Sequence, residues 1–238
     1  MTAPAGATAS ASRPTVRLSI VVPVLDEAEG IAAMLDAIAA PRAAGHEVIV
    51  VDGGSGDDTL ALSRSRADAA ISGPRGRARQ MNAGAKLAQG DVLLFLHADT
   101  RLPPSAVDRI ERAVAQGAAW GRFDVRIEGR SPMLAVVAAL MNARSRLTGI
   151  ATGDQAIFVR RDLFERLGGF PDQPLMEDVE LSRRLRACAA PACLREQVVT
   201  SGRRWERRGV WRTIVLMWRL RWRYWRGTAA DELARAYR

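Results

Sequence analysis

Short apolar runs alternate with amphipathic segments along the first half of the chain, and this alternation limits the folds open to it. We expect strands at residues 18–24, 47–52, 69–72 and 91–96, and helices at 28–40, 59–66, 76–88 and 104–115. Strands separated by helices of this length pair in parallel, because the helix returns the chain to the same edge of the sheet. The sequence therefore predicts an α/β fold with a mostly parallel, doubly wound sheet.

The pattern changes after residue 118. Strands are expected at 120–127 and 155–159, a helix at 132–147 between them, and further helices at 177–187 and 210–225. A length of 238 residues suits one large α/β domain. We assign residues 16–205 to that domain, residues 1–15 to a disordered tail, and residues 206–238 to an amphipathic helix and tail.

The turn after the second strand is the most informative short segment. The apolar run Val48–Val51 is typical of a buried parallel strand; it ends at Asp52, and Gly-Gly-Ser-Gly follows. Asp57 or Asp58 can cap the helix that begins near Thr59. The turn matches neither G-x-G-x-x-G nor a P-loop. Two interpretations stay open: a capped strand-to-helix turn, or a carboxylate that accepts hydrogen bonds from a base or a ribose.

Acidic residues stand at the ends of three predicted strands. They are Asp26 with Glu27, Asp52, and Asp99. Parallel strands bring their carboxyl ends to one edge of a sheet, where open α/β folds bind ligands. We therefore expect these carboxylates to converge on one site.

Basic residues outnumber acidic ones, with 35 Lys and Arg against 26 Asp and Glu and a net charge of +9. This charge favours phosphate-bearing substrates or an anionic membrane as partners. Because Arg richness also follows genome composition, we expect no nucleic-acid partner. Cys188 and Cys193 lack the His residues of a zinc site and are expected as reduced thiols. Without a signal peptide or an apolar run of ~20 residues, a cytoplasmic protein is expected.

Five short segments stand in a telling order along residues 18–205: Val-Val-Pro-Val-Leu-Asp-Glu at 21–27, Val-Asp-Gly-Gly-Ser-Gly-Asp-Asp-Thr at 51–59, Leu-His-Ala-Asp-Thr at 96–100, Gly-Gly-Phe at 168–170 and Met-Glu-Asp-Val-Glu-Leu at 176–181. Together they resemble the family-2 glycosyltransferases of the GT-A fold. Residues 76–84 and 203–205 further resemble a small bacterial subgroup of that family, linked by gene context to arsenosugar biosynthesis and to radical-SAM-associated transferases.

The resemblance implies an inverting transferase of the hexosyltransferase type, which moves a sugar from a UDP-sugar donor to a hydroxyl acceptor. Asp178 matches the general base. Asp99 matches the last Asp of the D-x-D motif, which holds Mg²⁺ or Mn²⁺ against the donor diphosphate. The nucleotide-binding positions of the family are matched by Pro23, Asp26, Glu27 and, for the uracil ring, Asp52.

His97 has two interpretations at the predicted metal site. The first Asp of D-x-D is His97 here, which either completes the metal shell beside Asp99 or only packs. The other imidazole, His46, is expected in an exposed helix–strand loop. A single carboxylate from the chain still suits a cation whose remaining ligands are diphosphate oxygens and water.

Other candidate residues also have two interpretations. Arg75, Arg77 and Arg79 either donate to the diphosphate or form a solvated face, and we favour a diphosphate role for Arg75 and Arg79. Asp154 either bonds sugar hydroxyls or belongs to a simple turn. Asp178 also suits the first turn of a helix, where a carboxylate meets the positive end of the helix dipole; we favour catalysis because of the motif.

The last predicted helix carries a stripe of tryptophans. Trp211, Trp218, Trp222 and Trp225 follow helical spacing, and arginines flank them. Such a helix either lies in a membrane interface or packs on the domain. We favour peripheral contact with the inner face of the cell membrane, which would suit an amphiphilic or lipid-linked acceptor.

Two other functions are alternatives for this chain. A sugar-nucleotide nucleotidyltransferase needs a Gly-rich loop with Lys or Arg after the first strand, where this chain has Leu-Asp-Glu-Ala at 25–28. A non-enzymatic module that binds membrane or nucleic acid does not explain the carboxylates at the strand ends. The sequence therefore favours the glycosyltransferase.

Overall fold

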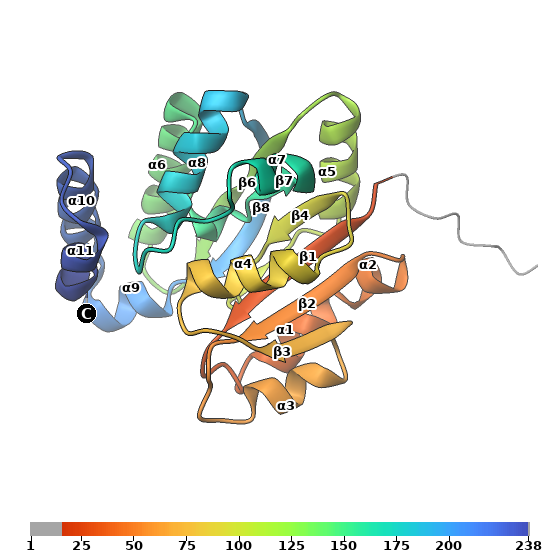
Figure 1. Ribbon diagram of the computed structural model, residues 1–238. Helices are drawn as coiled ribbons and strands as arrows, with labels where there is room; N and C mark the ends of the chain where they lie inside the picture. The colour runs from red at the N-terminus through yellow and green to blue at the C-terminus, as the bar shows by residue number, and fades with distance from the viewer. Residues whose placement is uncertain (1–15, 238) are drawn as a thin grey trace, which may run out of the picture.

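The computed structural model describes residues 16–237. Eight strands form one sheet in the order β3-β2-β1-β4-β7-β6-β8-β5. Helices cover both faces of this sheet (Figure 1). The tail predicted at residues 1–15 lies outside the described residues.

One half of the sheet is parallel. It contains β1 (Leu18–Val24), β2 (Glu47–Asp52), β3 (Ala69–Ser72) and β4 (Val92–Phe95), with β1 between β2 and β4. Every residue of β1, β2 and β4 is buried. Continuous apolar runs are expected for strands that helices cover on both faces.

The other half is mixed. The strand β7 (Phe158–Arg160) is antiparallel to both β4 and β6 (Trp120–Glu128). A second parallel pair joins β6 to β8 (Ala192–Ser201), and β5 (Thr100–Arg101) is antiparallel to β8. The predicted α/β fold with a mostly parallel sheet is therefore confirmed.

The sheet divides the core into two layers, each covered by helices. The helices are α1 (Ile31–Ala37), α2 (Ala39–Ala43), α3 (Thr59–Arg64), α4 (Arg77–Leu87), α5 (Ala106–Ala115), α6 (Met133–Thr148), α7 (Arg161–Arg166), α8 (Glu177–Cys188), α9 (Arg203–Arg208), α10 (Val210–Trp225) and α11 (Ala230–Tyr237). One apolar cluster holds residues of α1, α5 and α6, and a second holds residues of α4, α7 and α8. A smaller third cluster joins α10 and α11 to the segment before α8.

The structure corrects three predictions. The helix expected at 28–40 is two helices, because Pro41 has no N–H and its ring excludes a continuous turn with Ala37. The strand expected from Gln155 begins only at Phe158, since residues 153–155 form a 3₁₀ turn. His46 is buried, at 4% exposure, and its Nδ1 accepts a hydrogen bond from the backbone N–H of Leu18 at 3.2 Å.

Five elements were not predicted: β5, β8, α7, α9 and α11. The strand β8 is half-buried and carries Arg195 and Glu196, so it lacks the apolar run that marked the other strands. The helix α11 begins within the segment predicted as a tail, and α9 crosses the domain boundary predicted at residue 205. The domain limits stay a prediction.

Candidate active site

A cavity of 690 Å³ lies at the carboxyl ends of β1 and β4. Its walls come from the end of β1, the start of α4, the segment after β4, the 3₁₀ turn at 153–155, the start of α8, and the helices α9, α10 and α11. The cavity thus lies where strand ends meet in open α/β folds.

The cavity unites most of the predicted site residues. Seven line it: Pro23, Glu27, Arg75, His97, Asp99, Asp154 and Asp178. Three predicted residues are not in its wall: Asp26, Asp52 and Arg79. The roles of all ten remain predictions, and their contacts show what each position can do.

Asp178 stands at the start of α8 with both carboxylate oxygens oriented by backbone donors. The N–H of Gly153 donates to Oδ2 at 2.7 Å, and the N–H of Val179 donates to Oδ1 at 2.7 Å. Met176, the residue immediately before α8, has a left-handed backbone with φ of 65°. A non-glycine residue in this region is uncommon and is often found where a site fixes the backbone.

His97 and Asp154 form a pair across the cavity wall. Nδ1 of His97 lies 3.3 Å from Oδ1 of Asp154. Desolvation raises the pKa of the Asp154 carboxyl, but the hydrogen bond and charge of His97, with Arg77 and Arg204, lower it more, so its pKa falls below the ordinary value. The His97 ring also packs against Gly153, where an added Cβ would lie 2.5 Å from Nε2. The imidazole therefore holds the 153–154 turn in this structure.

The chain can supply few protein ligands to a metal. Among residues 16–237, no group of three or more His, Cys, Asp or Glu side chains converges into a metal site. Asp99 is exposed to the cavity, and one of its oxygens lies 3.4 Å from the Thr100 hydroxyl. Mg²⁺ and Mn²⁺ accept one or two carboxylates together with substrate phosphates and water. Asp99 fits this donor set, and a place for His97 in it stays a prediction.

Arg77 is the basic residue of α4 that faces the acidic side of the cavity. Its Nε lies 3.6 Å from Oε1 of the buried Glu177. Desolvation lowers the pKa of Arg77, and Glu177, Asp178 and Asp154 raise it more. Burial and Asp178 raise the pKa of the Glu177 carboxyl against the opposing effect of Arg77.

Arg79, on the same helix, is not part of the cavity wall. Its guanidinium makes two hydrogen bonds to the Asp172 carboxylate, at 2.6 and 3.0 Å, and both side chains are exposed. Two residues along a helix turn by ~200°, so Arg77 and Arg79 face opposite ways. Helical periodicity could have selected Arg77, because Gln80 and Gly84 of the same face are buried.

Asp26 and Asp52 hold a loop at the cavity edge. The N–H groups of Gly54 and Ser55 donate to Oδ2 of Asp52 at 3.0 Å each. The N–H of Gly56 donates to Oδ1 of Asp26 at 2.8 Å. Both carboxylates therefore fix the Gly-rich turn that follows β2.

Glu27 enters the cavity beside this loop, and Arg203 lies 3.6 Å from its Oε2. Burial raises the pKa of the Glu27 carboxyl, which Arg203 lowers to a smaller extent. Gln80, which was not predicted, ties the loop to the sheet, because its Nε2 donates to the carbonyls of Val24 and Val51 at 2.8 and 2.9 Å.

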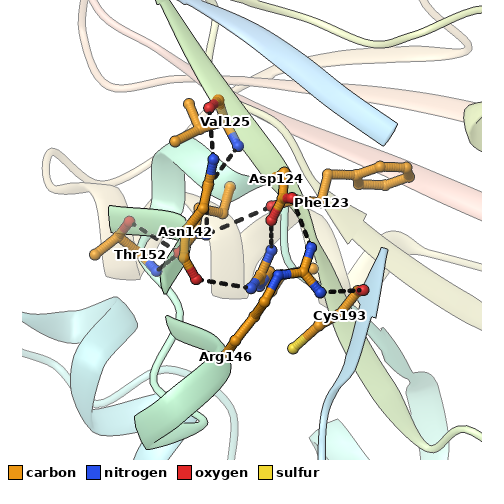
Figure 2. A network of polar contacts seen from close by, with 9 residues as sticks. Phe123, Asp124, Val125, Asn142, Arg146, Thr152 and Cys193 are labelled. Atoms are coloured by element: carbon orange, nitrogen blue, oxygen red, sulfur yellow. Dashed lines mark hydrogen bonds and ion pairs between the residues drawn. The ribbon is translucent and has the colours of Figure 1, made fainter. Parts of the chain in front are cut away.

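A polar network supports the turn that contacts Asp178 (Figure 2). Asn142 of α6 pairs with the backbone of Val125 through two hydrogen bonds of 2.8 and 2.9 Å. The buried Gln155 side chain donates to Asn142 Oδ1 at 3.4 Å and accepts from the Thr152 N–H at 3.2 Å. These contacts connect α6 and β6 to the turn whose Gly153 N–H reaches the Asp178 carboxylate.

Tyr237 and Arg204 complete the cavity wall from the carboxyl-terminal helices. The Arg204 guanidinium lies 4.1 Å from the centre of the Tyr237 ring. Burial lowers the pKa of Arg204 and raises that of the Tyr237 hydroxyl. No motif identified Tyr237, because only the packing of α11 brings it to the cavity.

The profile of the family described as "Glycosyl transferase family 2" matches residues 19–168. This match spans more than half of the chain and includes β1, β2 and β4 with the loops that follow them. The chain belongs to glycosyl transferase family 2. Family membership makes it a glycosyltransferase that uses nucleotide sugars, and it favours this function over the nucleotidyltransferase and the non-enzymatic module.

Two curated relatives are undecaprenyl-phosphate 4-deoxy-4-formamido-L-arabinose transferases. That of Aeromonas hydrophila is 31% identical over 113 residues, which cover 42% of this chain and 34% of the relative. That of Klebsiella pneumoniae is 26% identical over 164 residues, which cover 62% of this chain and 49% of the relative. The matches therefore span a third to a half of the length of these relatives.

Solved structures share the fold. S. aureus TarS 1–349 in complex with UDP-GlcNAc superimposes with a TM-score of 0.62 at 17% identity, covering 78% of this chain and 58% of TarS. The Pyrobaculum calidifontis mannosyltransferase PcManGT, in complex with GDP-Man and Mn²⁺, gives a TM-score of 0.57 at 23% identity, covering 77% and 56%. These likenesses confirm the GT-A fold.

Proposed function

We propose that the chain is an inverting glycosyltransferase that moves a sugar from a UDP-sugar to an acceptor hydroxyl. The observation that carries the proposal is the presence of Asp99 and Asp178 in the wall of one cavity. Asp99 is free to bind a cation, and Asp178 has both oxygens oriented by backbone donors. A metal-binding carboxylate and a fixed base are the two groups that this displacement needs.

The charge of the leaving group is the reason for proposing a metal. Breaking the sugar–phosphate bond leaves negative charge on a nucleoside diphosphate, and a divalent cation with oxygen ligands stabilises that charge. Asp99 would hold Mg²⁺ or Mn²⁺, and the cavity-lining Arg75 and Arg77 would donate to the same diphosphate. PcManGT, of the same fold, was solved with Mn²⁺ and a nucleotide sugar.

The proposed base would give inversion. A carboxylate near the anomeric carbon takes the proton of the attacking hydroxyl. One base and one displacement invert the anomeric configuration. Glu27 and Pro23 line the same cavity and match the family's nucleotide-binding positions, with Asp52 for the uracil ring.

A lipid phosphate is the second candidate acceptor. The curated relatives are named for undecaprenyl phosphate, and the tryptophan stripe of α10 is exposed, which favours contact with a membrane. A phosphate oxygen is already ionised at neutral pH and needs no base, whereas a hydroxyl does. The importance of Asp178 therefore distinguishes the two acceptors. Membership of the arsenosugar-linked subgroup stays a prediction.

Asp178→Asn tests this function. The variant keeps the size of the side chain but cannot take a proton, so transfer to a hydroxyl acceptor should fall by roughly 10²-fold or more while UDP affinity is retained. Transfer should be measured with UDP-sugars and two amphiphiles, one ending in a hydroxyl and one in a phosphate. Asp172→Asn is the matched control, because Asp172 lies outside the cavity wall. Hydroxyl transfer by Asp178→Asn at the wild-type rate would contradict the proposal.

A further inference from the structure

The helix α6 is apolar on its outward face as well as on its buried face. Leu134, Val137 and Ala138 are buried in the core. Six exposed positions of α6 are apolar: Ala135, Val136, Ala139, Leu140, Ala143 and Leu147. The charged residue exposed beside them is Arg146, which is paired with Asp124. Val136, Leu140 and Leu147 are 49%, 58% and 85% exposed. A helix face that meets only water normally carries polar and charged residues.

The helix α10 presents a second apolar face. Its inner side packs through Leu220 and Met217 against Leu175 and Met176. Its outer side carries the exposed tryptophans, of which Trp218 is 70% exposed. The membrane interpretation of the sequence therefore fits one face of α10 and the packing interpretation fits the other.

The two apolar faces are neighbours. Val210 and Ile214 of α10 pack against the apolar cluster that contains Leu134 and Val137 of α6. The two helices also contact each other locally, and Figure 1 shows α10 at the edge of the molecule on the side of α6. Their exposed stripes thus lie on adjacent helices.

Positive charge borders this surface. Arg212 and Arg219 flank the tryptophans and are exposed, and within residues 16–237 neither makes an ion pair. The Arg226 guanidinium lies 5.4 Å from the centre of the Trp222 ring. Apolar side chains framed by tryptophan and arginine fit the interface of a bilayer with anionic headgroups.

We propose that the outer faces of α6 and α10 together form one docking surface for an anionic lipid bilayer. The inference rests on the membrane contact considered under the proposed function and adds α6 to it. Thr213, Met217 and Arg221 of α10 line the cavity. Docking would therefore hold the cavity about one helix diameter, ~10 Å, from the headgroups. Within residues 16–237 no helix is long and apolar enough to span a membrane, so the surface would lie on the bilayer.

Flotation of the full chain with phosphatidylglycerol–phosphatidylcholine vesicles, without any sugar donor, tests the docking surface. Val136→Asp with Leu140→Asp should lower the bound fraction on the order of ten-fold, and Trp218→Ala with Trp222→Ala should do the same. Leu87→Asp is the matched control, because Leu87 is exposed on α4, away from this surface, and should bind like the wild type. Melting temperatures should stay near that of the wild type, since all of these side chains are exposed.

If the double variant of Val136 and Leu140 (the α6 pair) binds vesicles as well as the wild type, the inference is overturned, even where the double variant of Trp218 and Trp222 (the tryptophan pair) loses binding. A wild-type chain that does not float would overturn membrane contact altogether, without bearing on sugar transfer, which is measured separately. A wild-type dimer that the α6 pair converts to a monomer in the absence of vesicles would assign the surface to a second copy and would also overturn the inference. Leu147→Asp replaces the α6 pair if that pair does not fold.

Discussion

The backbone N–H of Gly153 donates a 2.7 Å hydrogen bond to Oδ2 of Asp178, which connects the 3₁₀ turn to the first turn of α8. The same turn carries Asp154, whose partner is His97. The position of the proposed base therefore depends on a turn that other side chains hold in place.

Gly153→Ala should disturb this turn. The added Cβ would lie 2.5 Å from the His97 ring, which must move or push the turn away from Asp178. We expect a loss of turnover on the order of 10²-fold from misplacement of the base, and a loss of about 1–3 kcal/mol in the free energy of unfolding. Transfer rates and urea unfolding curves measure the two effects. Gly30→Ala is the control, because a Cβ there meets nothing within 4 Å.

Arg144→Met should keep or raise stability. All three guanidinium nitrogens of Arg144 are buried and have no hydrogen-bond partner among residues 16–237. Burial lowers the pKa of Arg144 more than Asp178 raises it. Removing an uncompensated buried charge should raise the free energy of unfolding by about 1 kcal/mol or more. Urea unfolding should show Arg144→Met at or above the wild type.

Arg146→Met is the matched control on the same helix. Arg146 bonds Asp124 at 2.6 Å and the Cys193 carbonyl at 3.1 Å, so its loss should destabilise the protein. An Arg144→Met protein that unfolds as easily as Arg146→Met would show that Arg144 has stabilising partners after all.

Glu180 should make stability depend on pH in the acid range. Hydrogen bonds from Arg183 and Arg184 lower the pKa of the Glu180 carboxyl to about 2. Because the pKa of Glu180 is lower in the folded than in the unfolded state, its stabilisation is fully present above a pH of about 4.5. The stabilisation disappears as the pH falls towards 2. Glu180→Gln should lose about 1–2 kcal/mol at neutral pH, after allowance for solvent screening of the arginines.

Melting curves of wild type and Glu180→Gln should therefore converge as the pH is lowered. Glu165→Gln should change little at any pH, because its ion pair with Arg161 is exposed. A difference in melting temperature between wild type and Glu180→Gln that stays constant across this pH range would show that Glu180 does not cause the pH dependence.

Three strands of the parallel half, β1, β2 and β4, could be predicted from the sequence because they are buried on both faces. Val48–Val51 and Leu93–Phe95 are continuous apolar runs for that reason. The strand β8 gave no such signal, since only some of its side chains are buried. Complete burial therefore makes a strand recognisable in the sequence, whereas β8 is selected by tertiary packing alone.

The site was predictable to the extent that strand ends determine it. Asp99 and Glu27 follow strands and line the cavity as expected. Tyr237 reaches the cavity only through α11, and the support that Gln155 gives to Gly153 depends on Asn142 from a different helix. Contacts between distant segments leave no local pattern in a sequence.

The central claim is that Asp99 holds a cation against a nucleoside diphosphate in this cavity. Calorimetry with uridine diphosphate, with and without Mn²⁺, tests it on the wild type, on Asp99→Ala and on Asp108→Ala, an exposed carboxylate of α5 outside the cavity wall. Mn²⁺ should strengthen nucleotide binding in the wild type and in Asp108→Ala, and this gain should be lost in Asp99→Ala while its fold is retained. An equal gain from Mn²⁺ in Asp99→Ala, or no binding of uridine diphosphate by the wild type, would contradict the account.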